Sequence, residues 1–192
     1  MPGFRKLDEH EVLRTPLLRL ASARFESPAG EQFERDVVRH PGAVVVVPLT
    51  EARTVLMVRQ FRAAIDAELL ELPAGKRDVE GEPTELTATR ELAEEVGRRA
   101  GRLDLLARFY NSPGFSDEFS WLYLAQDLTP APLDRQGAEE RHMTIEEVPL
   151  AAVGPMITAG EIVDAKSIIG LTLTTDRLES LHHRSGGPGG TG

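Results

Sequence analysis

The chain has 192 residues, with 22 Lys and Arg against 31 Asp and Glu, a formal net charge of -9, and no cysteine. This length fits one compact domain with at most a small extra lobe, and the lack of cysteine excludes disulfides, thiol catalysis and zinc-thiolate sites. The acidic balance argues against nucleic-acid and membrane-surface partners. Because the chain has no apolar stretch of transmembrane length and no opening signal-peptide pattern, a cytoplasmic location is expected.

The first 40 residues are polar and frequently interrupted. Residues 12–25 and 32–39 have the composition of strands, and the turn-like residues 27–30 join them. A hairpin on its own is marginal in water. We therefore expect residues 1–41 to form a small strand lobe that needs another surface to bury it.

The next segment predicts two buried strands. Residues 43–49 form a continuous apolar run, which is typical of a strand buried on both faces. A short polar turn at 50–53 leads into a second apolar strand at 54–61. The short turn favours a hairpin between these two strands.

Helical and extended patterns alternate through the rest of the chain. A helix is expected at 84–97, followed by strands at 103–110 and 121–128 that are separated by a loop at 111–118. Further along lie a strand at 143–148 and helices at 150–159 and 165–174, with Gly160 as a C-cap candidate. This order predicts a mixed α/β fold in which residues 42–180 form the main domain. The Gly-rich end predicts a disordered tail over residues 181–192.

The helix at 84–97 carries an unusual concentration of acid. At 100° per residue the core-facing stripe is Leu86, Thr89, Leu92, Ala93 and Val96. A second arc holds Arg90, Glu91, Glu94 and Glu95. Three neighbouring carboxylates repel each other unless a cation lies among them, and hard oxygen ligands suit Mg2+ or Mn2+. By itself such a cluster is more often a solvated acidic face, so the surrounding residues have to decide.

Those surroundings resemble the Nudix box, G-x5-E-x7-R-E-U-x-E-E-x-G-U, in which U is aliphatic. The match runs through Gly75, Glu82, Arg90, Glu91, Leu92, Glu94, Glu95 and Gly97. There are two departures from the pattern. Six residues instead of five separate Gly75 from Glu82, which puts the role of Glu82 in doubt, and the last aliphatic position is Arg98. With seven matching polar or Gly positions, the chain is identified as a member of the Nudix family.

The resemblance implies a fold, a reaction and a ligand set. The fold would be an α/β/α sandwich with a mixed sheet, and the reaction hydrolysis of a nucleoside diphosphate linked to another group. Glu91 and Glu95 would be the principal ligands of Mg2+ or Mn2+, with Glu94 a further ligand. Ala74 would offer its backbone carbonyl to the metal. Arg90 would orient the carboxylates by ion pairing.

Residues outside the box look like the ADP-ribose pyrophosphatase branch of the family. These are Phe61 with Arg62, residues 71–75, and the loop at 112–118, in which Pro113 lies 16 residues beyond Gly97. The branch implies cleavage of ADP-ribose to AMP and ribose 5-phosphate. Pro113, Gly114 and Glu118 would bind substrate, and Arg62 would meet a phosphate, with Arg59 as the alternative. A type II turn is the competing interpretation of Pro113 and Gly114.

In this branch a glutamate from a late loop acts as the general base or positions the water. Glu139 and Glu140 are the candidates, and counting back from the strand at 143 favours Glu139 with Glu140 in reserve. Two solvated loop glutamates are the alternative. Phe25 and Phe33 are weaker candidates for stacking on adenine.

Proteins of the branch are homodimers whose N-terminal strands lie across the partner subunit, so a homodimer is expected. Two other functions compete. One is hydrolysis of another nucleoside diphosphate sugar, and the other is a non-catalytic module that senses a nucleotide. The intact helix carboxylates and the absence of a basic appended domain favour the enzyme.

Overall fold

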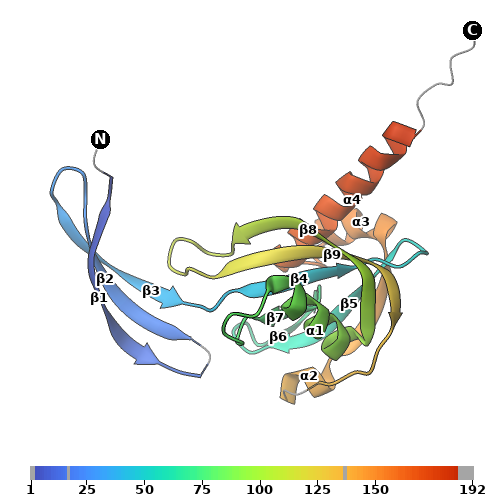
Figure 1. Cartoon of the computed structure of the whole chain (residues 1–192), viewed down its shortest axis with the longest axis horizontal. Coiled ribbons are helices and arrows are strands. Elements are labelled where there is room, and N and C mark those ends of the chain that lie inside the picture. Colours follow the sequence, from blue (N-terminus) through green and yellow to red (C-terminus); the bar gives the residue numbers. More distant parts are fainter. Residues whose placement is uncertain (1–2, 17, 136–137, 186–192) are drawn as a thin grey trace, which may run out of the picture.

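The computed structural model describes residues 3–16, 18–135 and 138–185. An antiparallel N-terminal sheet extends from the main body as an arm, shown in blue in Figure 1. Its strands, in spatial order, are β1 (Arg5–Arg14), β2 (Arg19–Glu26) and β3 (Gln32–Arg39). The single strand predicted at 12–25 was wrong. A turn closed by the Thr15 N–H and the Leu18 carbonyl, 2.9 Å apart, divides it into two strands beside Pro16, which cannot pair in a central strand.

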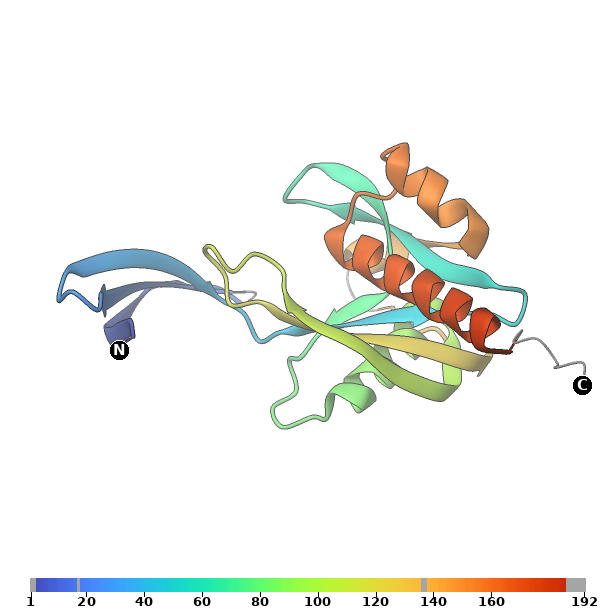
Figure 2. The same ribbon diagram turned by 90° about the horizontal axis from the view of Figure 1, so that it is seen from above.

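The main body contains two sheets and helices on both sides of them, as Figure 2 shows from above. One sheet has the order β7 (Ala74–Lys76), β4 (Ala43–Pro48), β9 (Phe119–Pro130) and β8 (Arg98–Tyr110). The other has the order β10 (Thr144–Pro149), β5 (Thr54–Arg62) and β6 (Ala67–Glu71). The helices are α1 (Thr84–Val96), α2 (Ala138–His142), the 3-10 turn η1 (Leu150–Ala152), α3 (Val153–Thr158) and α4 (Ala165–Ser185). Because β4 pairs parallel to β9 and antiparallel to β7, the sheet is mixed, which confirms the predicted fold class.

Strand β4 organises the core because every one of its residues is buried. Successive side chains of a strand point to opposite faces. Val44 and Val46 therefore pack with Leu92 of α1, whereas Val45 and Val47 pack with Leu171 of α4. The two helices thus cover opposite faces of one strand, and the residues that follow β6 lie between the two helices.

The hairpin predicted between the two buried strands was wrong. Strand β4 has β7 on one edge and β9 on the other, so no edge remains for β5, which pairs with β6 and β10 instead. A single bridge between Leu49 and Val55 is left at the turn. Sequence reasoning also missed the short elements β6, β7 and α2, and it ended the last helix at 174, whereas α4 runs to Ser185. The predicted disordered tail at 181–192 was wrong for residues 181–185, which belong to α4, and residues 186–192 lie outside the described residues.

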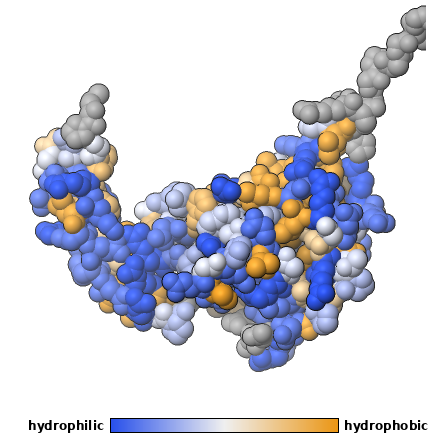
Figure 3. All heavy atoms as spheres, in the orientation of Figure 1, coloured by the Kyte–Doolittle hydropathy of each residue, from blue (hydrophilic) through white to orange (hydrophobic). Residues whose placement is uncertain are grey.

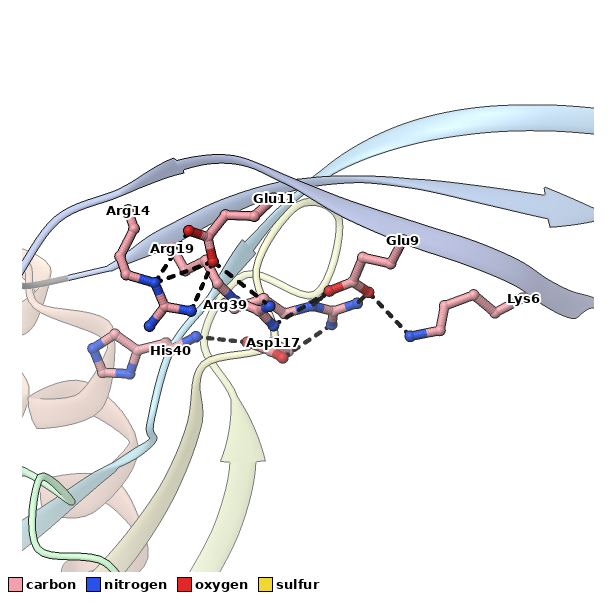
Figure 4. Close-up of polar contacts among 8 residues, drawn as sticks. All are labelled: Lys6, Glu9, Glu11, Arg14, Arg19, Arg39, His40 and Asp117. Atoms are coloured by element: carbon pink, nitrogen blue, oxygen red, sulfur yellow. Dashed lines mark hydrogen bonds and ion pairs between the residues drawn. The ribbon is translucent and has the colours of Figure 1, made fainter.

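The N-terminal sheet is joined to the body by a cluster of ion pairs (Figure 4). Arg39, at the end of β3, donates to Glu9 of β1 and, over 3.0 Å, to Asp117 of the loop between β8 and β9. The other Asp117 oxygen accepts the backbone N–H of His40 at 2.8 Å. The Val38 N–H donates to the Phe115 carbonyl at 2.7 Å. One arginine thus ties the sheet to the loop that carries the predicted substrate residues.

Side chains of the N-terminal sheet are mostly hydrophilic in the view of Figure 3, and the surface is hollowed between this arm and the body. Apolar side chains gather where α4 leaves the body. In the described part of the chain, no helix combines the length and apolar character needed to cross a membrane.

Candidate active site

Helix α1 turns two of its glutamates toward the protein interior. It ends where Gly97 adopts a left-handed conformation with φ of 63°. Its buried residues are Thr87, Ala88, Glu91, Leu92, Glu95 and Val96. The predicted stripe was therefore only partly right, because Leu86 is 58% exposed whereas Glu91 and Glu95 are 8% and 5% exposed. The acidic face is covered by protein, and it is not the solvated face of an ordinary surface helix.

Glu95 is held by the turn that follows β6. The backbone N–H of Ala74 donates to Glu95 Oε2 over 3.0 Å. Burial raises the pKa of Glu95 to about 8, and the charge of Glu91 adds to the rise. Ala74 thus contacts the predicted ligand through its N–H, while a metal contact by its carbonyl stays a prediction.

Glu91 lies directly against Gly75. A Cβ atom at position 75 would lie 1.8 Å from Glu91 Cδ, so only glycine leaves room for this carboxylate. Burial raises the pKa of Glu91 to about 7, although the charge of Arg90 opposes the rise. The Gly75 of the sequence motif is explained by this close approach and not by a special backbone angle.

Arg90 joins the remaining acids of the motif. Its Nη1 lies 2.8 Å from Glu91 Oε1 and 3.1 Å from Glu94 Oε2. Its Nη2 lies 3.6 Å from Glu82 and 3.5 Å from Asp78. The extra residue between Gly75 and Glu82 therefore does not remove Glu82 from the cluster. Glu82 is further held by the Thr87 hydroxyl at 2.7 Å.

Arg62 reaches the same region from the end of β5. Its Nε and Nη2 each donate to Glu71 over 2.7 Å, and its charge also acts on Glu95. Arg59, the alternative phosphate ligand, pairs with Glu146 of β10 at 2.5 Å. Of Arg59 and Arg62, Arg62 is therefore the one whose charge acts on an α1 carboxylate.

The late loop forms the short helix α2 rather than an irregular segment. Arg135 fixes its approach, because Nη2 donates to the Glu95 carbonyl over 3.1 Å and Nη1 to the Met143 carbonyl over 2.5 Å. The charge of Glu140 adds to the rise in the pKa of Glu95, while a role of Glu140 as base stays a prediction. The side chain of Glu139 lies outside the described residues. Sequence reasoning missed Arg135, and no local motif marks it.

Pro113 and Gly114 lie at a different place, in a pocket of about 490 Å³ between the N-terminal sheet and the loop that joins β8 and β9. Phe25, Phe33 and Arg35 line its other side. The two phenyl rings stack at 5.6 Å, and the Arg35 guanidinium lies 4.8 Å from the Phe33 centroid. Among the described residues, the α1 carboxylates do not line this pocket.

The type II turn does not describe this loop. The Phe115 N–H donates to the Ser112 carbonyl at 3.1 Å, but Gly114 lacks the positive φ that this turn type needs. The Glu118 backbone is fixed by the Ser116 hydroxyl at 3.1 Å and by the Asn111 N–H, also at 3.1 Å. Its role toward substrate stays a prediction.

The α1 carboxylates fit a divalent cation. Glu91 and Glu95 have raised pKa values because burial and the charges of nearby acids disfavour their ionised forms, and a bound cation would relieve both effects. The space that Gly75 leaves for Glu91 serves the same carboxylate. Within the described residues, no three acidic or histidine side chains already converge as a ligand cage, and Arg90 pairs with two of the candidates.

Comparisons with known proteins place the chain in a family. The ADP-ribose pyrophosphatase of Bacillus subtilis (strain 168) is 39% identical over 163 residues, which cover 85% of this chain and 88% of the relative. That of Mycobacterium tuberculosis (strain ATCC 25618 / H37Rv) is 39% identical over 162 residues, which cover 84% and 78%. A crystal structure of an ADP compounds hydrolase has the same fold, with a TM-score of 0.83 at 24% identity over 94% of this chain and 97% of that chain. The NUDIX domain model matches residues 39–168. With most of its length inside that match, the chain belongs to the NUDIX domain family.

Proposed function

We propose that the protein is a metal-dependent hydrolase that cleaves the diphosphate bond of ADP-ribose to AMP and ribose 5-phosphate. The observation that carries the proposal is the buried pair Glu91 and Glu95, held against Gly75 and Ala74 and flanked by Arg90. The ADP-ribose pyrophosphatases among the relatives support the choice of substrate.

Glu91 and Glu95, with Glu94 and the Ala74 carbonyl, would hold Mg2+ or Mn2+. When bound, such an ion offsets the charge of the diphosphate and makes a water molecule a better nucleophile. The chain's own part is to keep the carboxylates in place. The Ala74 N–H orients Glu95, and Arg90 restrains Glu91 and Glu94.

The substrate would be held from two sides. Arg62 lies beside the carboxylates with part of its guanidinium unused by Glu71, so it can donate to a phosphate oxygen. The pocket lined by Phe33 and Pro113 offers aromatic faces to a base, and Glu118 follows in the same loop. Glu139 or Glu140 of α2 would accept the proton of the attacking water.

A homodimer and a cytoplasmic location belong to the same proposal. The N-terminal sheet is held to the body largely through one loop, and β1 is exposed along most of its length, which supports a second subunit as its cover.

A substrate panel tests the function. Purified protein with Mg2+ is assayed against ADP-ribose, ADP-glucose, GDP-mannose and NADH, and the products are identified by chromatography. We expect the highest kcat/KM for ADP-ribose, with AMP and ribose 5-phosphate as products. A clear preference for another compound would reassign the substrate, and no hydrolysis of any compound would favour a nucleotide-sensing module.

A further inference from the structure

Glu71 is a buried acid that the proposed reaction leaves without a task. It is 1% exposed, and both of its oxygens accept from Arg62, one from Nε and one from Nη2, over 2.7 Å each. A buried carboxylate that lost one of its partners would be strongly unfavourable, so such a pair is fixed in geometry. Glu71 therefore sets the plane and direction of the Arg62 guanidinium.

The beginning of α4 holds Glu71 in turn. Lys166 Nζ lies 3.7 Å from Glu71 Oε2 and 2.6 Å from Asp164 Oδ1. Asp164 caps the helix, because it accepts the backbone N–H of Ser167 at 2.9 Å and the Ser167 hydroxyl at 2.7 Å. Two positive side chains, Arg62 and Lys166, thus pair with two negative ones, Glu71 and Asp164, and the charges balance.

Two further contacts bind α4 to the residue after Glu71. The Leu72 N–H donates to Ser167 Oγ over 2.7 Å. Gly170 lets the helix approach closely, since a Cβ there would lie 2.6 Å from Leu72 Cδ1. Ala74 and Gly75, which contact the α1 carboxylates, come two and three residues later. The segment is thus fixed by α4 at one end and by α1 at the other.

The Glu71 pair leaves one edge of Arg62 available. A guanidinium has five N–H groups, and Glu71 takes one from Nε and one from Nη2. The Arg62 side chain is 39% exposed, and its charge acts on Glu95. The remaining N–H groups are therefore available beside the carboxylate cluster.

We propose that Glu71 is a positioning residue for Arg62, and that the first turn of α4 holds Glu71 through Lys166 and Ser167. This proposal deepens the function above and rests on it. Arg62 contacts the diphosphate in an orientation that Glu71 imposes, and α4 thereby acts on the site through Glu71.

A double-mutant cycle tests the proposal. Glu71→Gln should lower kcat/KM for ADP-ribose about 10²-fold, the scale expected when a contact group is displaced by about 1 Å. In an Arg62→Ala background the same change should cost less than about 3-fold, because no guanidinium remains to be positioned. The affinity for the α,β-methylene analogue of ADP-ribose with Mg2+, measured by calorimetry, should show the same coupling between Glu71 and Arg62. A full loss in both backgrounds would assign Glu71 a general structural role and overturn the proposal.

Two controls separate positioning from folding. Glu146→Gln alters the Arg59–Glu146 pair, in which the arginine comes from the same strand as Arg62 and the glutamate from β10. Both side chains of this pair are more than a third exposed, and the change should leave kcat/KM unchanged. Lys166→Met should reproduce a weaker form of the Glu71 effect, and Lys166→Arg should restore activity. If Glu71→Gln fails to fold, the Lys166 variants still test the proposal. A Lys166→Met variant with wild-type kcat/KM would contradict the role of α4. If the proposed function is wrong, the wild-type protein itself does not hydrolyse ADP-ribose. If only the role of Glu71 is wrong, the wild-type protein is active and the variants do not show the expected differences in kcat/KM.

Discussion

At the scale of single residues, the site depends on the small residues Ala74 and Gly75 as much as on the acidic side chains. Gly75 leaves the space that the Glu91 carboxylate fills, and the Ala74 N–H fixes Glu95. Both acids are buried next to each other, an arrangement that is costly for the protein without a cation. These buried acids thus lower the stability of the metal-free protein, and they provide oxygen ligands for a divalent ion.

Gly75→Ala tests this point. The added Cβ would meet Glu91 Cδ at 1.8 Å, so we expect the carboxylate to move and Mn2+ affinity, measured by calorimetry, to fall about 10- to 100-fold. Gly154→Ala in α3 is the matched control, because a Cβ there meets nothing within 4 Å. Unchanged Mn2+ affinity in Gly75→Ala would show that Glu91 is not a ligand.

The acids of the site and their grouping could be predicted from the sequence because they lie within a few turns of one helix. Their burial could not, since helical periodicity favoured Leu86 for the core, and Glu91 is covered by Gly75, which lies in a separate, earlier segment of the chain and meets the helix only in the folded structure. The contact of Leu72 with Ser167 joins residues 95 positions apart, and no local pattern signals it. Arg62 was found as a candidate, but its fixed partner Glu71 was not.

At the scale of elements, the site is assembled by short segments that carry little sequence signal. Strand β7 has three residues and contacts α1 through the Ala74 N–H, and α2 has five residues and follows Arg135, which donates to the Glu95 carbonyl of α1. The predicted hairpin failed for a related reason. Apolar composition identifies β4 and β5 as buried strands, but the choice of neighbours depends on β7 and β9, which lie far along the chain.

Helix α2 gives a test of the attacking water. If Glu139 accepts its proton, Glu139→Gln should lower kcat about 10²- to 10⁴-fold with little change in KM. Glu140→Gln, made in parallel, shows which residue of α2 has this role, since the charge of Glu140 already acts on Glu95. Steady-state kinetics with ADP-ribose supplies the measurement. If both variants keep full activity, α2 carries no base.

The joint between the N-terminal sheet and the body gives a pH prediction. Hydrogen bonds from Arg39 and Lys6 lower the pKa of Glu9 from 4.5 to about 2. The ionised Glu9 therefore stabilises the joint above pH 4.5, and this contribution is lost as the pH falls from 4.5 toward 2. We expect amide hydrogen exchange in β1 to become faster over that range. The free energy of local opening should fall by an amount on the order of 1 kcal/mol or less. In Glu9→Gln the exchange should already be fast at pH 6, and an unchanged β1 would contradict the role of the pair.

At the scale of the whole molecule, the arm formed by β1, β2 and β3 has little core of its own. Ala21, Ser22 and Ala23 are buried, but most of β1 and much of β3 are exposed. The hollow between arm and body in Figure 3 offers room for a second copy. We therefore expect a second subunit to cover the arm.

Light scattering at micromolar concentration checks this expectation. A homodimer should give about twice the chain mass of 21.1 kDa. Arg39→Ala should loosen the arm and weaken the dimer. A clean monomer for the wild-type protein would refute the dimer. The pocket at Phe33 would then be formed by residues of a single chain.

The most direct test of the central claim is the rate of ADP-ribose hydrolysis as a function of Mg2+ in the wild-type protein and in Glu95→Gln. The wild-type protein should release AMP and ribose 5-phosphate only when a divalent ion is present. Glu95→Gln should fold, with melting in the absence of metal at least as high as the wild type because a buried charge is removed. Its turnover should fall about 10³-fold, since several kcal/mol of charge stabilisation in the transition state is lost. Wild-type turnover in pure, folded Glu95→Gln would contradict the assignment of this buried helix face as the metal site.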